Sequence, residues 1–205
     1  MNSPSSISIV VATSRFRFVH LLVLIAVIAV AIAFFIPMMQ RLREQSNLAQ
    51  CKDNLRKIGG GLLQYAGVNE GQLPVSPTVE NPHLELVAAL GSGRFGLDPG
   101  VFYCPSQTQA GLNYSKGNFA AGIIGYYYYG ALSESADPSL SKFLRGGVEW
   151  PRLLNTGMDS KTWVMSDIWI SAVPTAHPGY RKGVNYLMLD GSVSFVAESP
   201  RQQFH

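Results

Sequence analysis

An uncharged apolar run near the N-terminus constrains this sequence more than any other feature. Residues Leu21–Met39 read LLVLIAVIAVAIAFFIPMM and carry neither a charge nor a strongly hydrogen-bonding side chain. As an α-helix the run is about 29 Å long, close to the roughly 30 Å of hydrocarbon in a bilayer. A helix can lie in lipid because it satisfies its own backbone hydrogen bonds. The sequence therefore predicts one transmembrane helix over 21–39.

Two other interpretations of this run fit less well. A buried core helix would need a domain large enough to cover a helix that is apolar on every side. In a secretory signal peptide, Arg15 and Arg17 would form the basic region. The run, however, is longer than the roughly 7–15 apolar residues of such a peptide, and no A-x-A-like cleavage site follows it. We therefore predict a retained anchor.

The helix is predicted to continue beyond the membrane as an amphipathic segment over 40–66. Pro37 lacks an N–H and is predicted to kink the helix, and the glycines at 59–61 are predicted to loosen its end. The stripe would dock on the chain's own sheet, which is the commoner arrangement, or form a coiled coil. Its apolar residues alternate in spacing between three and four, as one helix face does: Leu48, Cys51, Leu55, Ile58, Leu62 and Tyr65.

Residues 67–205 are predicted to form one β-rich globular domain. Strand-forming residues are dense in 161–170, and two further runs, 185–189 and 192–196, flank Asp190-Gly191. An Asp-Gly pair between two such runs indicates a hairpin, because a type I′ turn needs positive φ at both central residues. The four tyrosines at 126–129 predict a packed strand or, as the alternative, a surface that binds a sugar or a partner.

Two cysteines and one loop histidine complete the candidate residues. Cys51 and Cys104 either form one disulfide that pins the helix to the domain or stay free, since the sequence does not give their distance. A cysteine-ligated zinc site is not predicted, because no CxxC or HxxxH spacing occurs. His177 precedes Pro178-Gly179 and is predicted to hydrogen-bond the backbone of its loop.

These residues resemble a known family. Residues 21–65 resemble the prepilin-type N-terminal cleavage and methylation domain, and more specifically a bacterial family whose members also carry a C-terminal H-x9-DG motif. The matching elements are the apolar helix ending at Pro37, the stretch 51–59 (CKDNLRKIG), the Cys-Pro-Ser element within 102–106, and His177 through Gly191. Twelve residues, rather than nine, separate His177 from Asp190.

Two positions depart from the family pattern. Phe16 takes the place of the residue that is N-methylated after cleavage, and Arg15 stands where the family has the glycine before the cut. His20 stands where the family has a glutamate, whose carboxylate pairs with the terminal amine of a neighbouring subunit. A histidine, whether neutral or protonated, offers no carboxylate.

The resemblance implies an α+β, pilin-like fold, in which the long N-terminal helix packs on a small antiparallel sheet. It also implies a bacterial inner-membrane protein with a cytoplasmic N-terminus, a cytosolic leader-like tail over 1–20 and a periplasmic domain. The basic residues alone do not favour this orientation, because more of them follow the span than precede it. A calcium-binding role for Asp190, known in some pseudopilins, is the alternative to a turn role.

Three functions follow from these observations. The first is a pilin-like or pseudopilin structural subunit of a type II secretion or type IV pilus-like system, with membrane lipid and other pilin-like subunits or secretion components as partners. The second is a non-assembling anchored protein whose exoplasmic domain binds a ligand or partner, which the residues at 15 and 20 favour. The third, an enzyme, has no positive signal, because no G-x-S-x-G, Walker or HExxH motif occurs.

Cofactor and nucleic-acid functions are not predicted either. The net charge is only +3, and the lysines and arginines are spread along the chain rather than clustered as in a nucleic-acid binder. The four histidines, His20, His83, His177 and His205, lie far apart in the sequence. We therefore predict no metal, no cofactor and no catalytic residue.

Overall fold

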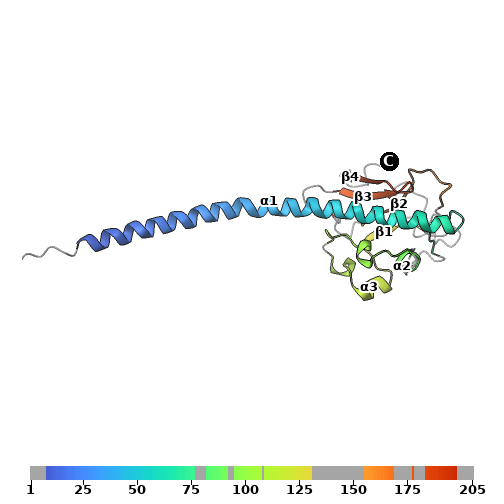
Figure 1. Ribbon diagram of the computed structural model, residues 1–205, viewed down its shortest axis with the longest axis horizontal. Helices are drawn as coiled ribbons and strands as arrows, with labels where there is room; N and C mark the ends of the chain where they lie inside the picture. The colour runs from blue at the N-terminus through green and yellow to red at the C-terminus, as the bar shows by residue number, and fades with distance from the viewer. Residues whose placement is uncertain are drawn as a thin grey trace, which may run out of the picture. The chain divides into compact units, whose positions relative to one another are not determined.

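The computed structural model describes residues 8–76, 82–91, 95–107, 109–130, 155–168, 177 and 183–197, with the backbone alone at 8–17 and 82. The chain divides into two compact units, Met1–Arg43 and Glu44–His205. One long helix, α1 (Ser8–Val68), contributes to both (Figure 1). The described secondary structure is α+β, as predicted, with a long apolar N-terminal helix and a small antiparallel sheet.

The second unit contains the remaining elements. Its helices are short: α2 (Pro82–Gly91), the 3-10 turns η1 (Pro99–Phe102) and η2 (Ala110–Leu112), and α3 (Lys116–Ala120). Its strands are β1 (Tyr126–Tyr128), β2 (Trp163–Asp167), β3 (Gly183–Met188) and β4 (Val193–Ala197). The four strands form one sheet in the order β1-β2-β3-β4, with each neighbouring pair antiparallel.

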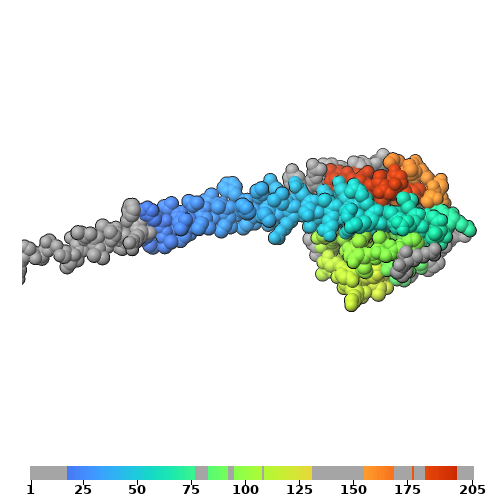
Figure 2. Space-filling view, in the orientation of Figure 1, coloured from blue at the N-terminus to red at the C-terminus, as the bar shows by residue number. Residues whose placement is uncertain are grey.

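The first part of α1 exposes apolar side chains along its whole length. Its most apolar 18-residue window has a mean hydropathy of 3.1 and no buried residue. Figure 2 shows this stretch in blue, with its side chains bare on the face in view. The helix is long and apolar enough to cross a bilayer. Pro37 lies inside the helix, which continues on both sides of it, and the kink stays a prediction.

The second part of α1 buries the predicted stripe. Cys51, Leu55 and Ile58 have no exposed surface, and Leu62 is 2% exposed. These residues belong to the core cluster that also contains residues from α2 and from the strands. The stripe therefore packs within the chain's own second unit. This agrees with the commoner of the two predicted arrangements, in which the stripe packs on its own domain rather than in a coiled coil. The helix exceeds the predicted 21–66, since it begins at Ser8 and ends at Val68.

The glycines at 59–61 do not loosen the helix, which contradicts the sequence prediction. Gly59 faces β3, and a Cβ built there would lie 2.8 Å from Leu187 Cδ1. On Gly61, a Cβ would lie 3.0 Å from Leu97 Cδ1 and 3.5 Å from Leu90 of α2. Both glycines thus allow the helix backbone to approach its neighbours closely. The packing offsets the helix-propensity cost of about 1 kcal/mol per glycine.

Alanine substitutions at adjacent glycines are expected to act in opposite directions. Gly60→Ala meets no atom within 4 Å, so it should raise the free energy of unfolding by about 0.5–1 kcal/mol through helix propensity. Gly59→Ala overpacks the buried Leu187 and should lower that free energy by about 1 kcal/mol or more. Urea denaturation of the two variants measures the difference. Equal stability of both would contradict the close packing of α1 on β3.

The predicted hairpin around Asp190-Gly191 forms, but its turn is not type I′. Strands β3 and β4 pair from Gly183↔Ala197 to Leu187↔Val193. Among the described residues of this turn only Gly191 has positive φ, at 79°. Its N–H donates to the carbonyl of Met188 at 3.0 Å, and the N–H of Met188 donates to Ser192 at 2.8 Å. This is the three-residue loop that ends in a left-handed glycine. The extra loop residue, Leu189, is buried and apolar, which explains why the sequence pattern concealed it.

The four tyrosines pack into or against the core rather than forming a binding surface, and the first three make strand β1. Tyr126 and Tyr128 are fully buried, Tyr129 is 3% exposed, and only Tyr127 is partly exposed. The hydroxyl of Tyr128 donates to the carbonyl of Pro74, and the hydroxyl of Tyr129 lies 2.8 Å from Ser166 Oγ. These bonds provide hydrogen-bond partners for two hydroxyl groups that burial removes from water.

Candidate functional site

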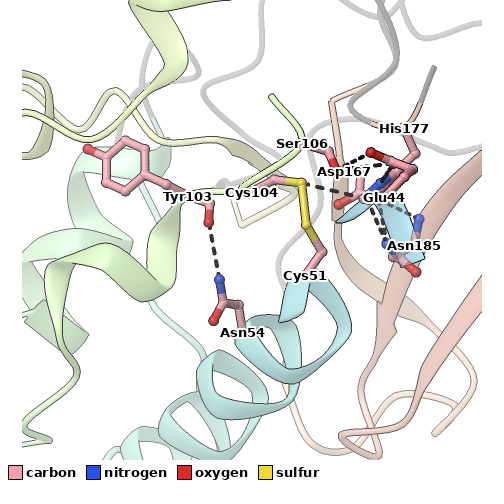
Figure 3. The surroundings of a disulfide bond; sticks show 9 residues. All are labelled: Glu44, Cys51, Asn54, Tyr103, Cys104, Ser106, Asp167, His177 and Asn185. Atoms are coloured by element: carbon pink, nitrogen blue, oxygen red, sulfur yellow. Dashed lines mark hydrogen bonds and ion pairs between the residues drawn. A yellow bond between two sulfur atoms is a disulfide. The ribbon is translucent and has the colours of Figure 1, made fainter. Parts of the chain in front are cut away.

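A disulfide joins α1 to the segment after η1. Cys51 and Cys104 are bonded, with their Cα atoms 5.3 Å apart, and both side chains are buried. Next to this bond, Asn54 on the following turn of α1 donates from Nδ2 to the carbonyl of Tyr103 at 3.1 Å (Figure 3). The disulfide and this hydrogen bond fix α1 against the segment that carries the Cys-Pro-Ser element.

The ring of His177 lies beside the disulfide and is fully buried. Its Nδ1 is 2.8 Å from Glu44 Oε1 at the start of the second unit, and its Nε2 is 3.6 Å from Cys104 Sγ. Because a carboxylate oxygen accepts hydrogen bonds, Nδ1 carries a proton and donates to Glu44. The Ser106 hydroxyl also reaches Glu44, at 3.1 and 3.0 Å from its two oxygens. The ring contacts side chains, whereas the sequence predicted a bond to loop backbone.

A buried carboxylate completes the cluster on the sheet side. Asp167, at the end of β2, places Oδ2 3.5 Å from His177 Nε2. The same oxygen accepts from the backbone N–H of Asn185 at 2.8 Å and from its Nδ2 at 2.7 Å. Asp167 and Asn185 are both fully buried. Asp167 Oδ1 has no hydrogen-bond partner among the residues that the structure describes. Figure 3 shows these side chains converging beside the disulfide.

Burial dominates the electrostatics of Asp167. Removal from water raises the pKa of its carboxyl to about 6, although the neighbouring His177 and the Asn185 hydrogen bonds act in the opposite direction. A carboxylate, an imidazole and two sulfurs thus meet in a place that water does not reach. Their potential ligand atoms, from Cys51, Cys104, Asp167 and His177, all lie within 4.8 Å of one another. This donor set can bind a transition metal when the sulfurs are thiolates.

The other predicted site residues lie elsewhere. Arg15 and Phe16 are in the helical backbone of α1, and their side chains lie outside the described residues. His20 is exposed on the first part of α1. Asp190 and Gly191 follow the C-terminal end of β3, whereas His177 forms a backbone bridge with Gly183 at the N-terminal end of that strand. The terminal motif residues therefore do not form one site.

Asp190 has a structural role in its turn. Its Oδ1 accepts from the backbone N–H of Ser192 at 2.9 Å, and its Oδ2 lies 2.7 Å from Lys161 Nζ. The hydrogen bond from Lys161, followed by those from Ser192, holds the pKa of Asp190 well below its usual range. Both oxygens are thus engaged, which favours the turn interpretation over the calcium-binding alternative.

Sequence reasoning missed Glu44, Ser106, Asp167 and Asn185. The spacing motifs of zinc sites gave no signal, because the donors come from α1, from the segment after η1, from β2 and from the chain near Gly183. One signal was present: Asp167 interrupts a run that is otherwise rich in strand formers. An acid inside a buried strand usually has a partner, since an unpaired buried charge is costly.

His83 lies apart from this cluster and makes the stability of the second unit depend on pH. The backbone N–H of Tyr128 donates to its Nε2 at 3.1 Å, and burial lowers the pKa of the ring to about 4. The unfolded chain therefore binds this proton near pH 6.5, where the folded chain does not. We expect the free energy of unfolding to have its full value above pH 6.5 and to decrease toward pH 4, by up to about 1.4 kcal/mol per pH unit.

The variant His83→Gln isolates the contribution of this histidine to the pH dependence. The glutamine amide oxygen can accept the hydrogen bond from the backbone N–H of Tyr128, and the amide does not titrate. Urea denaturation of both proteins between pH 4 and 7.5 measures the difference in slope. The wild-type protein should lose stability relative to the variant as pH falls through this window. Parallel pH profiles would contradict a neutral, hydrogen-bonded His83.

In comparisons with protein family profiles, with curated proteins and with solved structures, the chain matches none.

Proposed function

We propose that the protein is a membrane-anchored, pilin-like structural subunit of a type II secretion or type IV pilus-like system. The observation that carries this proposal is the apolar first part of α1, which has no buried residue in its most apolar window. Burying apolar surface is worth about 25 cal/mol per Å², so a helix with this surface in water is strongly unfavourable. Lipid, or the equivalent helices of other subunits, would cover it.

The second unit supports the pilin-like part of the proposal. The same helix that carries the apolar stretch continues into the core, where Cys51, Leu55 and Ile58 are buried near a four-stranded antiparallel sheet. A pilin-like subunit needs this combination, because one helix must hold a folded domain and also pack against neighbouring subunits. The resemblance of residues 21–65 to prepilin N-termini also supports a pilin-like subunit.

The disulfide supports an exoplasmic position for the second unit. Disulfides persist in oxidising compartments such as the bacterial periplasm and are rare in the cytosol. With Cys51 and Cys104 bonded, the unit Glu44–His205 is best placed outside the cytoplasm. The proposal therefore puts the chain in a bacterial inner membrane, spanning once, with its N-terminus in the cytoplasm and its C-terminal unit in the periplasm.

A second candidate, an anchored protein that does not assemble, is favoured by one observation. Arg15 and His20 replace the glycine and the glutamate that prepilin processing and assembly use in the family that the sequence resembles. In this alternative, α1 serves only as the anchor, and the exoplasmic unit binds a ligand or a partner.

The mature N-terminus distinguishes the two candidates. Intact-mass and peptide mass spectrometry of the protein purified from its own membrane reads this terminus directly. A chain that begins at a methylated Phe16 supports entry into a filament. A chain that retains residues 1–15 supports the anchored alternative and contradicts processing.

A photo-cross-linking amino acid at Phe34 provides a second, independent test. Phe34 is 75% exposed on the apolar part of α1, so a neighbouring subunit would contact it. Assembly predicts covalent dimers and higher species after irradiation in the membrane. The same group at Tyr127, the one partly exposed residue of strand β1, serves as the control for random collision. Monomer alone from both positions would contradict assembly.

A further inference from the structure

We propose that the reduced form of this protein binds one zinc ion, with Cys51, Cys104, His177 and Asp167 as its ligands. In the disulfide form the two sulfurs carry no thiolate charge and cannot serve as zinc ligands. The same buried place would therefore hold either a disulfide or a metal, according to the oxidation state of its cysteines. This inference stands on the second unit alone and does not depend on whether the chain assembles.

The distances between donor atoms already approach those of a tetrahedral site. With zinc bonds of roughly 2.0–2.3 Å, two ligands of a tetrahedral site lie about 3.3–3.8 Å apart. His177 Nε2 is 3.6 Å from Cys104 Sγ and 3.5 Å from Asp167 Oδ2. All four ligand atoms lie within 4.8 Å of one another. The two sulfurs would also have to move apart, which breaking the disulfide permits.

The neighbours of the donors hold them as the surroundings of a metal usually do. A zinc-bound histidine typically donates its second ring N–H to a carboxylate, which fixes the tautomer and the ring orientation. Glu44 takes this role at 2.8 Å from Nδ1, and so leaves Nε2 to face the sulfur, the carboxylate and, at 3.4 Å, Asn185 Nδ2. Asn185 holds Asp167 through two hydrogen bonds to Oδ2, and Oδ1 lacks a partner within the described part of the chain.

A disulfide alone does not explain this arrangement. Asp167 is fully buried, its Oδ1 has no hydrogen-bond partner among the described residues, and the disulfide has no charge to compensate a carboxylate there. A zinc ion would compensate the charges of Asp167 and of two thiolates together. The donor set also selects the kind of metal, because thiolate and imidazole suit zinc, whereas calcium and magnesium prefer oxygen ligands.

The chemistry of the exchange balances with a dithiol as reductant. The dithiol transfers two electrons and two protons to the Cys51–Cys104 bond, which becomes two thiols while the reductant becomes a disulfide. Zinc then displaces both thiol protons to solvent and binds the thiolates. Reoxidation by a disulfide reverses the order: the two thiolates give two electrons to that disulfide, which takes up two protons from solvent and becomes a dithiol, while the Cys51–Cys104 bond forms again and zinc leaves.

Metal titration of the full-length chain in detergent tests this proposal. The chain is reduced with a phosphine, freed of metal and titrated with zinc against a chromophoric chelator. We expect one zinc per reduced chain and none per disulfide-bonded chain. Cobalt in place of zinc should give the visible bands of a tetrahedral site together with a thiolate charge-transfer band, which reports the ligand types without any substitution.

Variants then separate ligands from bystanders. His177→Ala and Asp167→Ala should each weaken zinc binding by at least about tenfold. Glu44→Gln, which keeps a hydrogen-bond acceptor for Nδ1 but removes the charge, should weaken it by roughly 10–100-fold. His83→Ala is the matched control, because this histidine lies outside the cluster, and it should leave the affinity unchanged.

Several outcomes would overturn the proposal. A reduced chain that binds no zinc, or that stays unfolded by circular dichroism with and without zinc, would do so. Cobalt spectra without thiolate bands would also overturn it, as would equal affinities of the wild-type, His177→Ala and Asp167→Ala proteins. None of these results would bear on the membrane anchor.

Discussion

Two lysines placed in the apolar part of α1, at Ile28 and Ile32, are expected to prevent membrane insertion of the full-length chain. Both side chains are about half exposed within their unit, at 49% and 51%, and no residue in the surrounding apolar window is buried. A lysine at the centre of a transmembrane helix costs about 2.5–3.5 kcal/mol, so the pair should cost roughly 5–7 kcal/mol. This cost is the largest effect that the account predicts for any substitution.

The measurement is the fraction of protein that resists alkaline carbonate extraction of the membrane. The control variant, Ile28→Leu with Ile32→Leu, keeps the apolar character and should behave like the wild-type protein. The lysine variant should appear in the extract or be degraded. If it resisted extraction as well as the leucine control, lipid burial of this part of α1 would be contradicted.

Loss of the disulfide is expected to have the second largest effect. The bond closes a loop with a sequence separation of 53 residues, so the loop-entropy relation predicts a contribution of about 4 kcal/mol to the stability of the second unit. The double variant Cys51→Ala, Cys104→Ala should therefore unfold at a temperature lower by roughly 8–16 °C. Alanine avoids placing two hydroxyls in a buried place that lacks partners for them.

Thermal unfolding followed by near-ultraviolet circular dichroism measures this effect in metal-free buffer with a chelator. A reducing agent should lower the unfolding temperature of the wild-type protein and leave that of the alanine variant unchanged, which provides an internal control. If the variant stayed within about 1 kcal/mol of the oxidised wild-type protein, the bond would not stabilise the unit as the loop length predicts.

Features set by local sequence could be predicted well. The stripe from Leu48 to Tyr65 depends only on helical periodicity, and its central residues are buried as expected. The hairpin at Asp190-Gly191 also follows from neighbouring residues. The predicted type I′ turn was wrong, because the buried, apolar Leu189 in the loop looks like one more strand residue in the sequence.

Features set by contacts distant in the sequence could not be predicted. The sequence predicts that the glycines at 59–61 loosen the helix, and only the closeness of Leu187 and Leu97 explains why the helix is instead tightly packed there. The polar cluster is a clearer case, since Glu44 and His177 are 133 residues apart. No spacing rule links two such positions, because their meeting depends on how α1 docks on the sheet.

The partition of the unmodified full-length chain tests the central claim most directly. The protein is expressed without substitutions, and mass spectrometry verifies that its N-terminal helix is intact. We expect it to float with lipid in a density gradient and to leave the membrane only when detergent is added. A chain with an intact helix that remained dispersed in the detergent-free aqueous phase would contradict the account.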